Sequence, residues 1–441
     1  MPTNSAPSCV SIGIRSRGGW HESIYPHCIG SVAFTALLLT RGVSPNSSSP
    51  ARVVRAASMH ERRADQTSTL LSDGRVLIVG GMVENGVFLN SAELYDPKQG
   101  TFLITGNMQS SRVEHTATLP PNGKVLIAGG LAGRGPGVVA STEIYDPATG
   151  HFSAGPLMSA PRTGHAAVLL GNNKVLVVGG ADNNGPLASA EIYDPASNRF
   201  IATASMDTAR VTRFAVLLHD GRVLVTGGRN GRSAEVYDPT AATWRAVGDM
   251  TSVRQKHAAT LLADGRVLIT GGAPDSHWHP LRTAEIFDPH TNKFTAIADM
   301  ELARFKLPAA TASLRNGEVL IAGGASKVEI YDNATGRFSR AGSVAEPHFF
   351  AAATSLDDGR VLITGGYGLP NGRPNGPVST EHGFMSPKDS SSGHAIRCVH
   401  ELDASDCDSP ARWEVMFIGP LQTHTFNFGA ELRKPPNDRA A

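Results

Sequence analysis

The sequence predicts an all-β fold, a seven-bladed β-propeller, because several features recur in phase along the chain. An apolar run that ends in Gly-Gly occurs seven times, with steps of 49, 50, 48, 44, 52 and 42 residues between the first glycines. A repeat of about 50 residues is typical of one class of propeller blade. The first glycines are Gly80, Gly129, Gly179, Gly227, Gly271, Gly323 and Gly365.

A turn dipeptide precedes each apolar run, and a Glu-aliphatic-aromatic-Asp segment follows six of the seven runs. Asn, Asp and Gly tolerate the positive φ values that a two-residue hairpin needs. We therefore expect four antiparallel strands in each unit, with the apolar run as a second strand buried on both faces. The dipeptides are Asp73-Gly74, Asn122-Gly123, Asn172-Asn173, Asp220-Gly221, Asp264-Gly265, Asn316-Gly317 and Asp358-Gly359. The third-strand glutamates are Glu93, Glu143, Glu191, Glu235, Glu285 and Glu329.

An aromatic residue stands seven positions after the third-strand aromatic in six units. A Gly-Gly pair followed by Tyr and then Trp at this step resembles the kelch repeat family, although Phe usually replaces Trp here. The resemblance covers residues 52–381 and implies four-stranded kelch blades of the galactose oxidase/kelch superfamily, as in stand-alone bacterial-type kelch proteins. The pairs are Tyr95 and Phe102, Tyr145 and Phe152, Tyr193 and Phe200, Tyr237 and Trp244, Phe287 and Phe294, and Tyr331 and Phe338.

The seventh unit lacks a fourth strand of its own. Its third strand begins as 379–381, but His382-Gly383 stand where an aliphatic and an aromatic residue are expected. In five other units the fourth-strand aromatic lies six residues before a Met, and Val53 lies six residues before Met59. We therefore expect 52–59 to be an N-terminal fourth strand that closes the ring and removes its open edges.

These features divide the chain into three parts. Residues 51–383 form the predicted propeller, 1–50 a mostly disordered leader and linker, and 384–441 a tail that is either disordered or a small accessory segment. Residues 28–40 are apolar and follow Arg15 and Arg17, as in an export signal. We expect an extracytoplasmic or secreted protein, and otherwise a cytoplasmic one.

Composition excludes several partners. The formal net charge is +1, so no overall field attracts nucleic acid. No apolar stretch approaches the roughly 20 residues of a transmembrane helix. We expect a monomer without a cofactor or metal, whose partner is a protein or a carbohydrate.

The predicted blades present two faces. The Asp-Gly hairpins and Asp-Pro turns are alike in all units and form the hairpin face. The loops after the Gly-Gly pairs differ in length, and they form the loop face together with the segments that lead into each first strand. Variable loops suit recognition, and kelch propellers commonly bind partners there, so we expect the ligand on the loop face.

Two series of polar residues lie in the lead-in segments. Each arginine follows a Met by four residues, and a second slot lies three positions later. A basic, imidazole-rich mouth for an anion or metal is one interpretation, but zinc would require the histidines to converge. Recurrence in nearly every unit favours the other interpretation, a structural role for these residues and for the third-strand glutamates. The arginines are Arg63, Arg112, Arg162, Arg210, Arg254 and Arg304, and the second slot holds Gln66, His115, His165, Arg213, His257 and Leu307.

The candidate ligand-binding residues all lie on the predicted loop face. The most distinctive cluster is His277-Trp278-His279, because Trp is a good stacking anchor for sugars and peptides. The candidates are Arg112, His115, Arg162, His165, Arg213, Arg229, His257, His277, Trp278, Arg282 and Tyr367.

An enzymatic function is the alternative. Resemblance to galactose-oxidase-like propellers implies copper and a Tyr cross-linked to a Cys, but the predicted ring contains no Cys. A sugar-processing enzyme of mutarotase or epimerase type would need an acid/base pair in the axial pocket. No residue pair requires it, so we predict a non-catalytic binding protein without catalytic residues. The four cysteines are Cys9, Cys28, Cys398 and Cys407.

Overall fold

The structure is a computed structural model of the 441-residue chain. It describes residues 52–83, 87–133, 137–228, 231–274, 279–307, 309–343 and 348–367, and the backbone of 416–419. The chain divides into residues 1–47, which lie outside this description, and residues 48–441. Among the described residues, none forms a helix long and apolar enough to cross a membrane.

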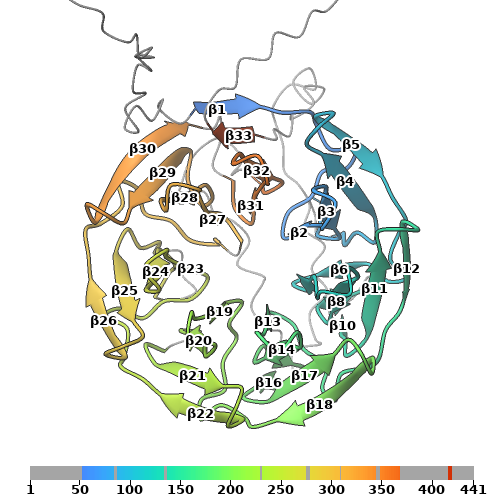
Figure 1. The fold of residues 1–441 in the computed structure, drawn as a ribbon, viewed down its shortest axis with the longest axis horizontal. Helices are drawn as coiled ribbons and strands as arrows, with labels where there is room; N and C mark the ends of the chain where they lie inside the picture. The colour runs from blue at the N-terminus through green and yellow to red at the C-terminus, as the bar shows by residue number, and fades with distance from the viewer. Residues whose placement is uncertain are drawn as a thin grey trace, which may run out of the picture. The chain divides into compact units, whose positions relative to one another are not determined.

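The strands described in residues 48–441 form seven four-stranded antiparallel sheets placed around a central axis (Figure 1). The predicted all-β fold of four-stranded sheets is thus confirmed. From the axis outward, sheet 1 is β2 (Thr67–Leu70), β3 (Val76–Val79), β4 (Ala92–Asp96) and β5 (Thr101–Ile104), and sheet 2 is β7 (Thr116–Thr118), β8 (Val125–Ala128), β11 (Thr142–Asp146) and β12 (His151–Ala154). Sheet 3 is β13 (Ala166–Leu169), β14 (Val175–Val178), β17 (Ala190–Asp194) and β18 (Arg199–Thr203), and sheet 4 is β19 (Ala215–Leu217), β20 (Val223–Thr226), β21 (Ala234–Asp238) and β22 (Thr243–Ala246).

The remaining sheets follow the same order. Sheet 5 is β23 (Ala258–Leu261), β24 (Val267–Thr270), β25 (Ala284–Asp288) and β26 (Lys293–Ala296), and sheet 6 is β27 (Thr311–Ser313), β28 (Val319–Ile321), β29 (Lys327–Asp332) and β30 (Arg337–Ser343). Sheet 7 is β31 (Ala352–Ser355), β32 (Val361–Thr364), β33 (Met416–Gly419) and β1 (Arg52–Arg55). Short strands extend the loop face: β6 (Arg112–Val113), β9 (Leu131–Ala132), β10 (Gly137–Val138), β15 (Ala181–Asp182) and β16 (Gly185–Pro186).

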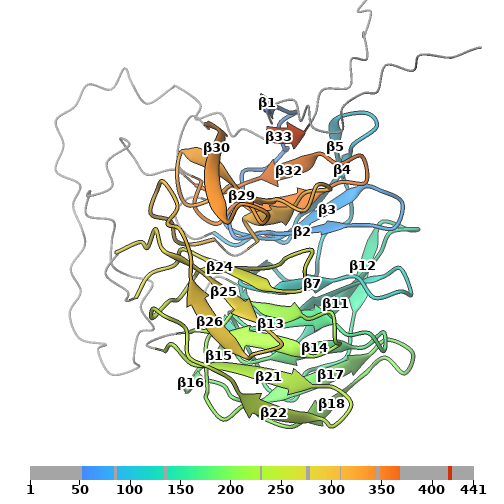
Figure 2. The ribbon, with the colours of Figure 1, turned by 60° about the vertical axis from the view of Figure 1, so that its left-hand side comes forward.

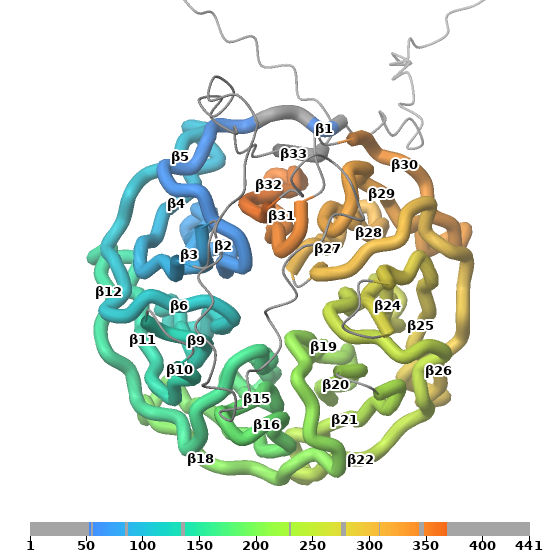
Figure 3. The backbone as a smooth tube through the Cα atoms, turned by 180° about the vertical axis from the view of Figure 1, so that it is seen from behind, coloured from blue at the N-terminus to red at the C-terminus, as the bar shows by residue number. Residues whose placement is uncertain are grey.

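The two predicted faces are separate in space. In Figure 2 the short strands β15 and β16 lie at the left, and the hairpin between β2 and β3 points to the right. Figure 3 views the ring from the side of these short strands, which is the loop face. Residues that lead into the first strands pair with the loops after Gly-Gly, as Ala64 does with Met82.

The core lies between neighbouring sheets. The second strands are fully buried because each packs against sheets on both sides, as the continuous apolar runs indicate. Between sheets 4 and 5, for example, Leu224 and Val236 share a cluster with Val267 and Phe287. The recurring aromatic pairs also meet, and the ring centroids of Tyr95 and Phe102 are 4.9 Å apart.

The Gly-Gly pair marks the point where the next sheet comes closest. Gly129 has a φ of +62°, which disfavours other residues. A Cβ there would also lie 2.5 Å from the Arg162 carbonyl oxygen and 2.8 Å from the His165 ring. The same pair of contacts recurs at Gly227, with Arg254 and His257. The motif is therefore required by contact between sheets as well as by the turn.

Sheet 7 combines both ends of the chain, but its third strand differs from the predicted one. Residues 379–381 lie outside the described residues, and β33 occupies the third position between β32 and β1. Strand β33 thus lies beyond the predicted propeller boundary at 383. The apolar β-forming run 415–418 suits this position better than a segment interrupted by His382-Gly383. Strand β1 pairs with β33, and Val53 packs against the core next to sheet 6.

Candidate functional site

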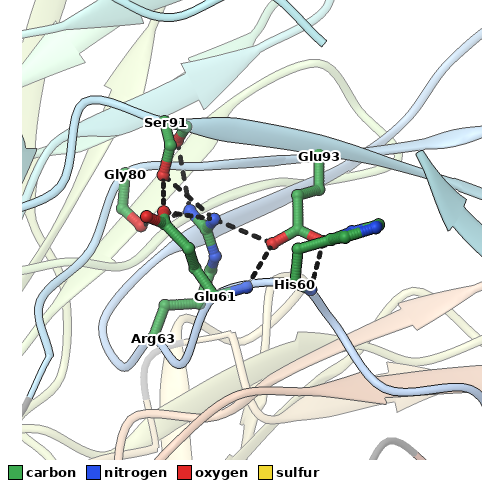
Figure 4. Close-up of polar contacts among 6 residues, drawn as sticks. All are labelled: His60, Glu61, Arg63, Gly80, Ser91 and Glu93. Carbon is green, nitrogen blue, oxygen red and sulfur yellow. Dashed lines mark hydrogen bonds and ion pairs between the residues drawn. The ribbon is translucent and has the colours of Figure 1, made fainter. Parts of the chain in front are cut away.

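The repeated arginines are buried and bonded within their own sheets. Arg112 is 1% exposed and donates to the carbonyls of Gly129 (3.0 Å) and Ser141 (2.9 Å). Its Nη2 also lies 3.1 Å from Oε1 of Glu143. Figure 4 shows the equivalent network of sheet 1, in which Arg63 contacts Gly80, Ser91 and Glu93.

Each third-strand glutamate completes this network. In sheet 1 the carboxylate of Glu93 accepts hydrogen bonds from the backbone N–H groups of His60 (2.8 Å) and Glu61 (3.1 Å). A buried ion pair is tolerated when its remaining polar atoms are bonded in this way. Arg112 and Arg162, two of the candidate ligand residues, therefore make the contacts that the structural interpretation predicts.

The three candidate histidines each contact a threonine of the preceding sheet. The Nε2 atoms of His115, His165 and His257 lie 3.1, 3.0 and 2.9 Å from the hydroxyls of Thr67, Thr116 and Thr226, respectively. Burial disfavours the charged imidazole and, with the neighbouring arginines, lowers the pKa of each to about 3. These neutral histidines join neighbouring sheets, and within the described residues no group of three or more His, Cys, Asp or Glu side chains is placed to hold a metal.

A second set of residues varies between units and lies two positions after the repeated arginines, or after His348, which takes the place of the arginine in the seventh unit. Asp65, Glu114, Lys256 and Lys306 have φ values of +57°, +58°, +53° and +57°, and Phe350 has a φ of +58°. Left-handed backbone costs an ordinary residue about 1–2 kcal/mol. Gly164 has a φ of +58° at the same position, so the conformation belongs to the repeat and the side chains are what differ.

Backbone hydrogen bonds connect these residues from sheet to sheet. The N–H of Asp65 donates to Phe350 (3.0 Å), and the N–H of Phe350 donates to Lys306 (3.1 Å). The N–H of Leu307 likewise donates to Lys256 (3.2 Å). They therefore meet near the axis on the loop face. We call this site the axial mouth, and it comprises Asp65, Glu114, Arg213, Lys256, Lys306, Phe350 and Tyr367.

Arg213 connects sheets that are not adjacent. It leads into sheet 4, yet its guanidinium forms ion pairs with Asp65 before sheet 1 and Glu114 before sheet 2. Burial opposes its charge, but the two carboxylates raise the pKa of Arg213 above its ordinary value. Burial also raises the pKa of Asp65, whereas Arg213 and the Thr163 hydroxyl bring the pKa of Glu114 below its ordinary value.

Lys306 lies among aromatic rings at the other side of the mouth. Its Nζ is 2.5 Å from the Tyr367 hydroxyl and 5.2–5.8 Å from four ring centroids. Burial lowers the pKa of Lys306 to about 7; the charge of Lys256 adds to this effect and that of Asp65 opposes it. Burial also raises the pKa of Tyr367 to about 12. The rings are those of Phe305, Phe349, Phe350 and Tyr367.

A cavity of about 550 Å³ extends along the axis from Arg213. Its walls are the first strands of four consecutive sheets, β19, β23, β27 and β31. Small residues such as Ala259, Thr311 and Ser355 line the cavity, so few side chains project into it. Arg213, which bonds the two mouth carboxylates, is the mouth residue that lines this cavity.

Comparison with known proteins identifies the repeat. The kelch motif matches residues 66–109, 161–206 and 210–251. The chain therefore contains kelch repeats. A solved structure with the same fold is a fungal alcohol oxidase of the AA5 family in complex with copper, at 16% identity, a TM-score of 0.58 and 73% coverage of each chain. At this identity the likeness concerns the fold alone. No curated protein matches the sequence.

Within the described part of this kelch protein, no group of three or more His, Cys, Asp or Glu side chains is placed to hold a copper ion. Its buried histidines each bond a different threonine, and its mouth carboxylates bond Arg213. The four cysteines lie outside the described residues. No step through copper is therefore derived for this protein.

The candidates predicted from the sequence have different locations in the kelch ring. Arg213 and Tyr367 lie in the mouth, whereas Arg282 is exposed on the loop face and pairs with Asp299 at 3.3 Å. Arg229, His277 and Trp278 lie outside the described residues. Sequence reasoning missed Asp65, Glu114, Lys256, Lys306 and Phe350. The sequence did contain one signal for them. The position two residues after the repeated arginine, or after the histidine that replaces it, changes between Asp, Glu, Lys and Phe.

Proposed function

We propose that this kelch protein is a non-catalytic binding propeller that takes a protein or carbohydrate ligand at the axial mouth. One observation carries the proposal: charged side chains from the segments before five different sheets converge at one end of the axial cavity, although the repeat does not require them. Kelch repeats generally mediate binding, which supports a role of this kind. The charged residues are Asp65, Glu114, Arg213, Lys256 and Lys306.

The proposal includes a ring of seven blades that β1 closes as the outermost strand of sheet 7. Residues before five sheets can meet at one mouth only if the sheets keep fixed positions around the axis. Closure of the ring would hold them in these positions. Pairing of β1 with β33 and packing of Val53 against the neighbouring core support this view. Deletion of 51–59 should lower the melting temperature, and equal melting of the shortened and full chains would exclude closure by β1.

A sugar-processing enzyme of mutarotase or epimerase type is the second candidate. The observation that favours it is the Lys306–Tyr367 contact beside the cavity, because a lysine with a pKa of about 7 can exchange protons near neutral pH. Exchange of sugar anomers followed by NMR separates the two functions. Turnover that disappears in Lys306→Met would replace the binding-only proposal, as would metal-dependent turnover of any sugar.

The binding proposal is tested by thermal shift of the full chain against a panel of saccharides and short peptides. Lys306→Met and Tyr367→Phe should abolish the shift that a ligand produces. The matched control is Lys174→Met, because Lys174 pairs with Asp194 on the hairpin face. A ligand whose shift survives both mouth changes would refute a site at the mouth.

A further inference from the structure

The charges of the axial mouth do not balance. Its described side chains include three cationic groups, Arg213, Lys256 and Lys306, but two carboxylates, Asp65 and Glu114. Both carboxylates bond directly to Arg213. Lys256 also acts electrostatically on both carboxylates, so the single excess positive charge belongs to the mouth as a whole. It corresponds to one negative charge on a ligand.

The three cationic groups surround one aromatic ring. Nζ of Lys306, Cζ of Arg213 and Nζ of Lys256 lie 5.2, 5.5 and 5.9 Å from the centroid of Phe350. Like charges gathered around one ring repel each other, and an anion between them would remove the repulsion. The ring itself offers an apolar surface for the carbon atoms of a ligand.

We propose that the axial mouth binds a carboxylate, whose oxygens accept hydrogen bonds from Nζ of Lys256 and Nζ of Lys306 while its carbon skeleton lies against Phe350. This inference rests on the proposed binding function and specifies its ligand class. A carboxylate matches the single excess charge better than a dianionic phosphate does. It can belong to an acidic sugar or to an acidic peptide side chain, and the two sources are distinguished below.

Binding of this kind is coupled to a proton. In the free protein the pKa of Lys306 is about 7, and the groups around it are Lys256, Asp65 and Tyr367, with Arg213 and Glu114 beyond Asp65 and His348 beside the Phe349–Phe350 segment. A bound carboxylate favours the charged lysine. Below about pH 7 Lys306 is already charged and affinity is highest; above it, binding takes up a proton, and affinity falls by up to about tenfold per pH unit.

Isothermal titration of the full chain with matched pairs of probes tests this inference. D-glucuronate is compared with D-glucose, and an acetylated tripeptide that contains Glu is compared with the same peptide that contains Gln. We expect the acidic member of at least one pair to bind at least about tenfold more tightly at pH 6, and this preference to decline by about pH 9. The pair that responds identifies the source of the carboxylate.

Three variants make the result specific. Lys306→Met should abolish the preference for the acidic probe. Lys306→Arg should keep it and remove its pH dependence, because Arg stays charged. Lys293→Met, on the outer strand of sheet 5, should change nothing. Equal affinity for acidic and neutral probes, or no binding of either acidic probe at millimolar concentration, overturns the carboxylate inference. If neutral ligands still lose binding in Lys306→Met, the proposed function survives that failure; if no ligand responds, both fail.

Discussion

Arg254 and Arg213 are both buried and both pair with carboxylates, but they serve different parts of the molecule. Arg254 pairs with Glu285 at 2.6 Å and donates to the Gly271 carbonyl at 2.8 Å, all within sheet 5. Arg213 instead extends from sheet 4 to residues before sheets 1 and 2. The first arrangement recurs around the ring, and the second occurs once among the described residues.

This difference shows where function can be sought in a repeat protein. A contact that recurs in six sheets satisfies a need that those sheets share, namely to bond the carbonyls beside Gly-Gly and the buried glutamate. Arg213 satisfies no such need, because sheet 4 already has Arg210 paired with Glu235. Exceptions to the repeat at the axis are therefore the better candidates for binding.

The largest effect should follow from Arg254→Met. The substitution leaves the Glu285 carboxylate buried without its ion pair, and both side chains are fully buried. Loss of one partner of such a pair costs about 3–5 kcal/mol. Urea unfolding should show this loss, while the folded fraction keeps its ligand affinity. If Arg254→Met changed the ligand affinity but not the stability, the proposed difference between a structural Arg254 and a functional Arg213 would be wrong.

Arg213→Met should have the opposite profile. We expect a loss of about 2–3 kcal/mol, because Arg213 is 14% exposed and Glu114 is 29% exposed, so water can solvate the remaining carboxylates in part. The mouth also loses one positive charge, so carboxylate binding should weaken by at least about tenfold. Unfolding and titration of the same sample measure both effects, and unchanged binding would count against a functional mouth.

A smaller effect concerns the histidines between sheets. The pKa of His165 is about 3 in the folded protein and about 6.5 when unfolded, so the folded state disfavours protonation. Its contribution is complete above about pH 6.5 and is lost as the pH falls toward 3, by about 2 kcal/mol at pH 5.

His165→Gln should therefore reduce the loss of stability between about pH 7 and pH 5. Gln is a conservative choice, because Gln66 occupies the same slot in sheet 1 and bonds the Thr364 carbonyl at 2.9 Å. Unfolding at the two pH values provides the measurement. The same pH dependence in the variant and the wild type would show that His165 does not titrate as described.

The fold was largely predictable because its determinants are local and repeated. Positive φ at Gly129 and the 4.9 Å contact of Tyr95 with Phe102 both follow from short motifs. The third strand of sheet 7 was not predictable in this way. Strand β33 pairs with β32 across more than 50 residues of chain, and its short apolar run carries no kelch signature.

The candidate site was less predictable, because it depends on which side chains meet at the axis. Arg213 and Tyr367 were identified from the sequence, but their partners Asp65 and Lys306 stand far away in the chain and have no common motif. Only the ring brings them together. Recurrence correctly indicated the contacts of Arg112, but it gave no information about a position whose residue type varies between units.

Amide hydrogen exchange of the full chain, with and without saturating D-glucuronate, tests the central claim most directly. The account predicts slower exchange on binding in 63–66, 305–307 and 348–350, which form the mouth, and no change in the hairpins at 72–75 and 263–266. Protection of the hairpins with an unchanged mouth would contradict it.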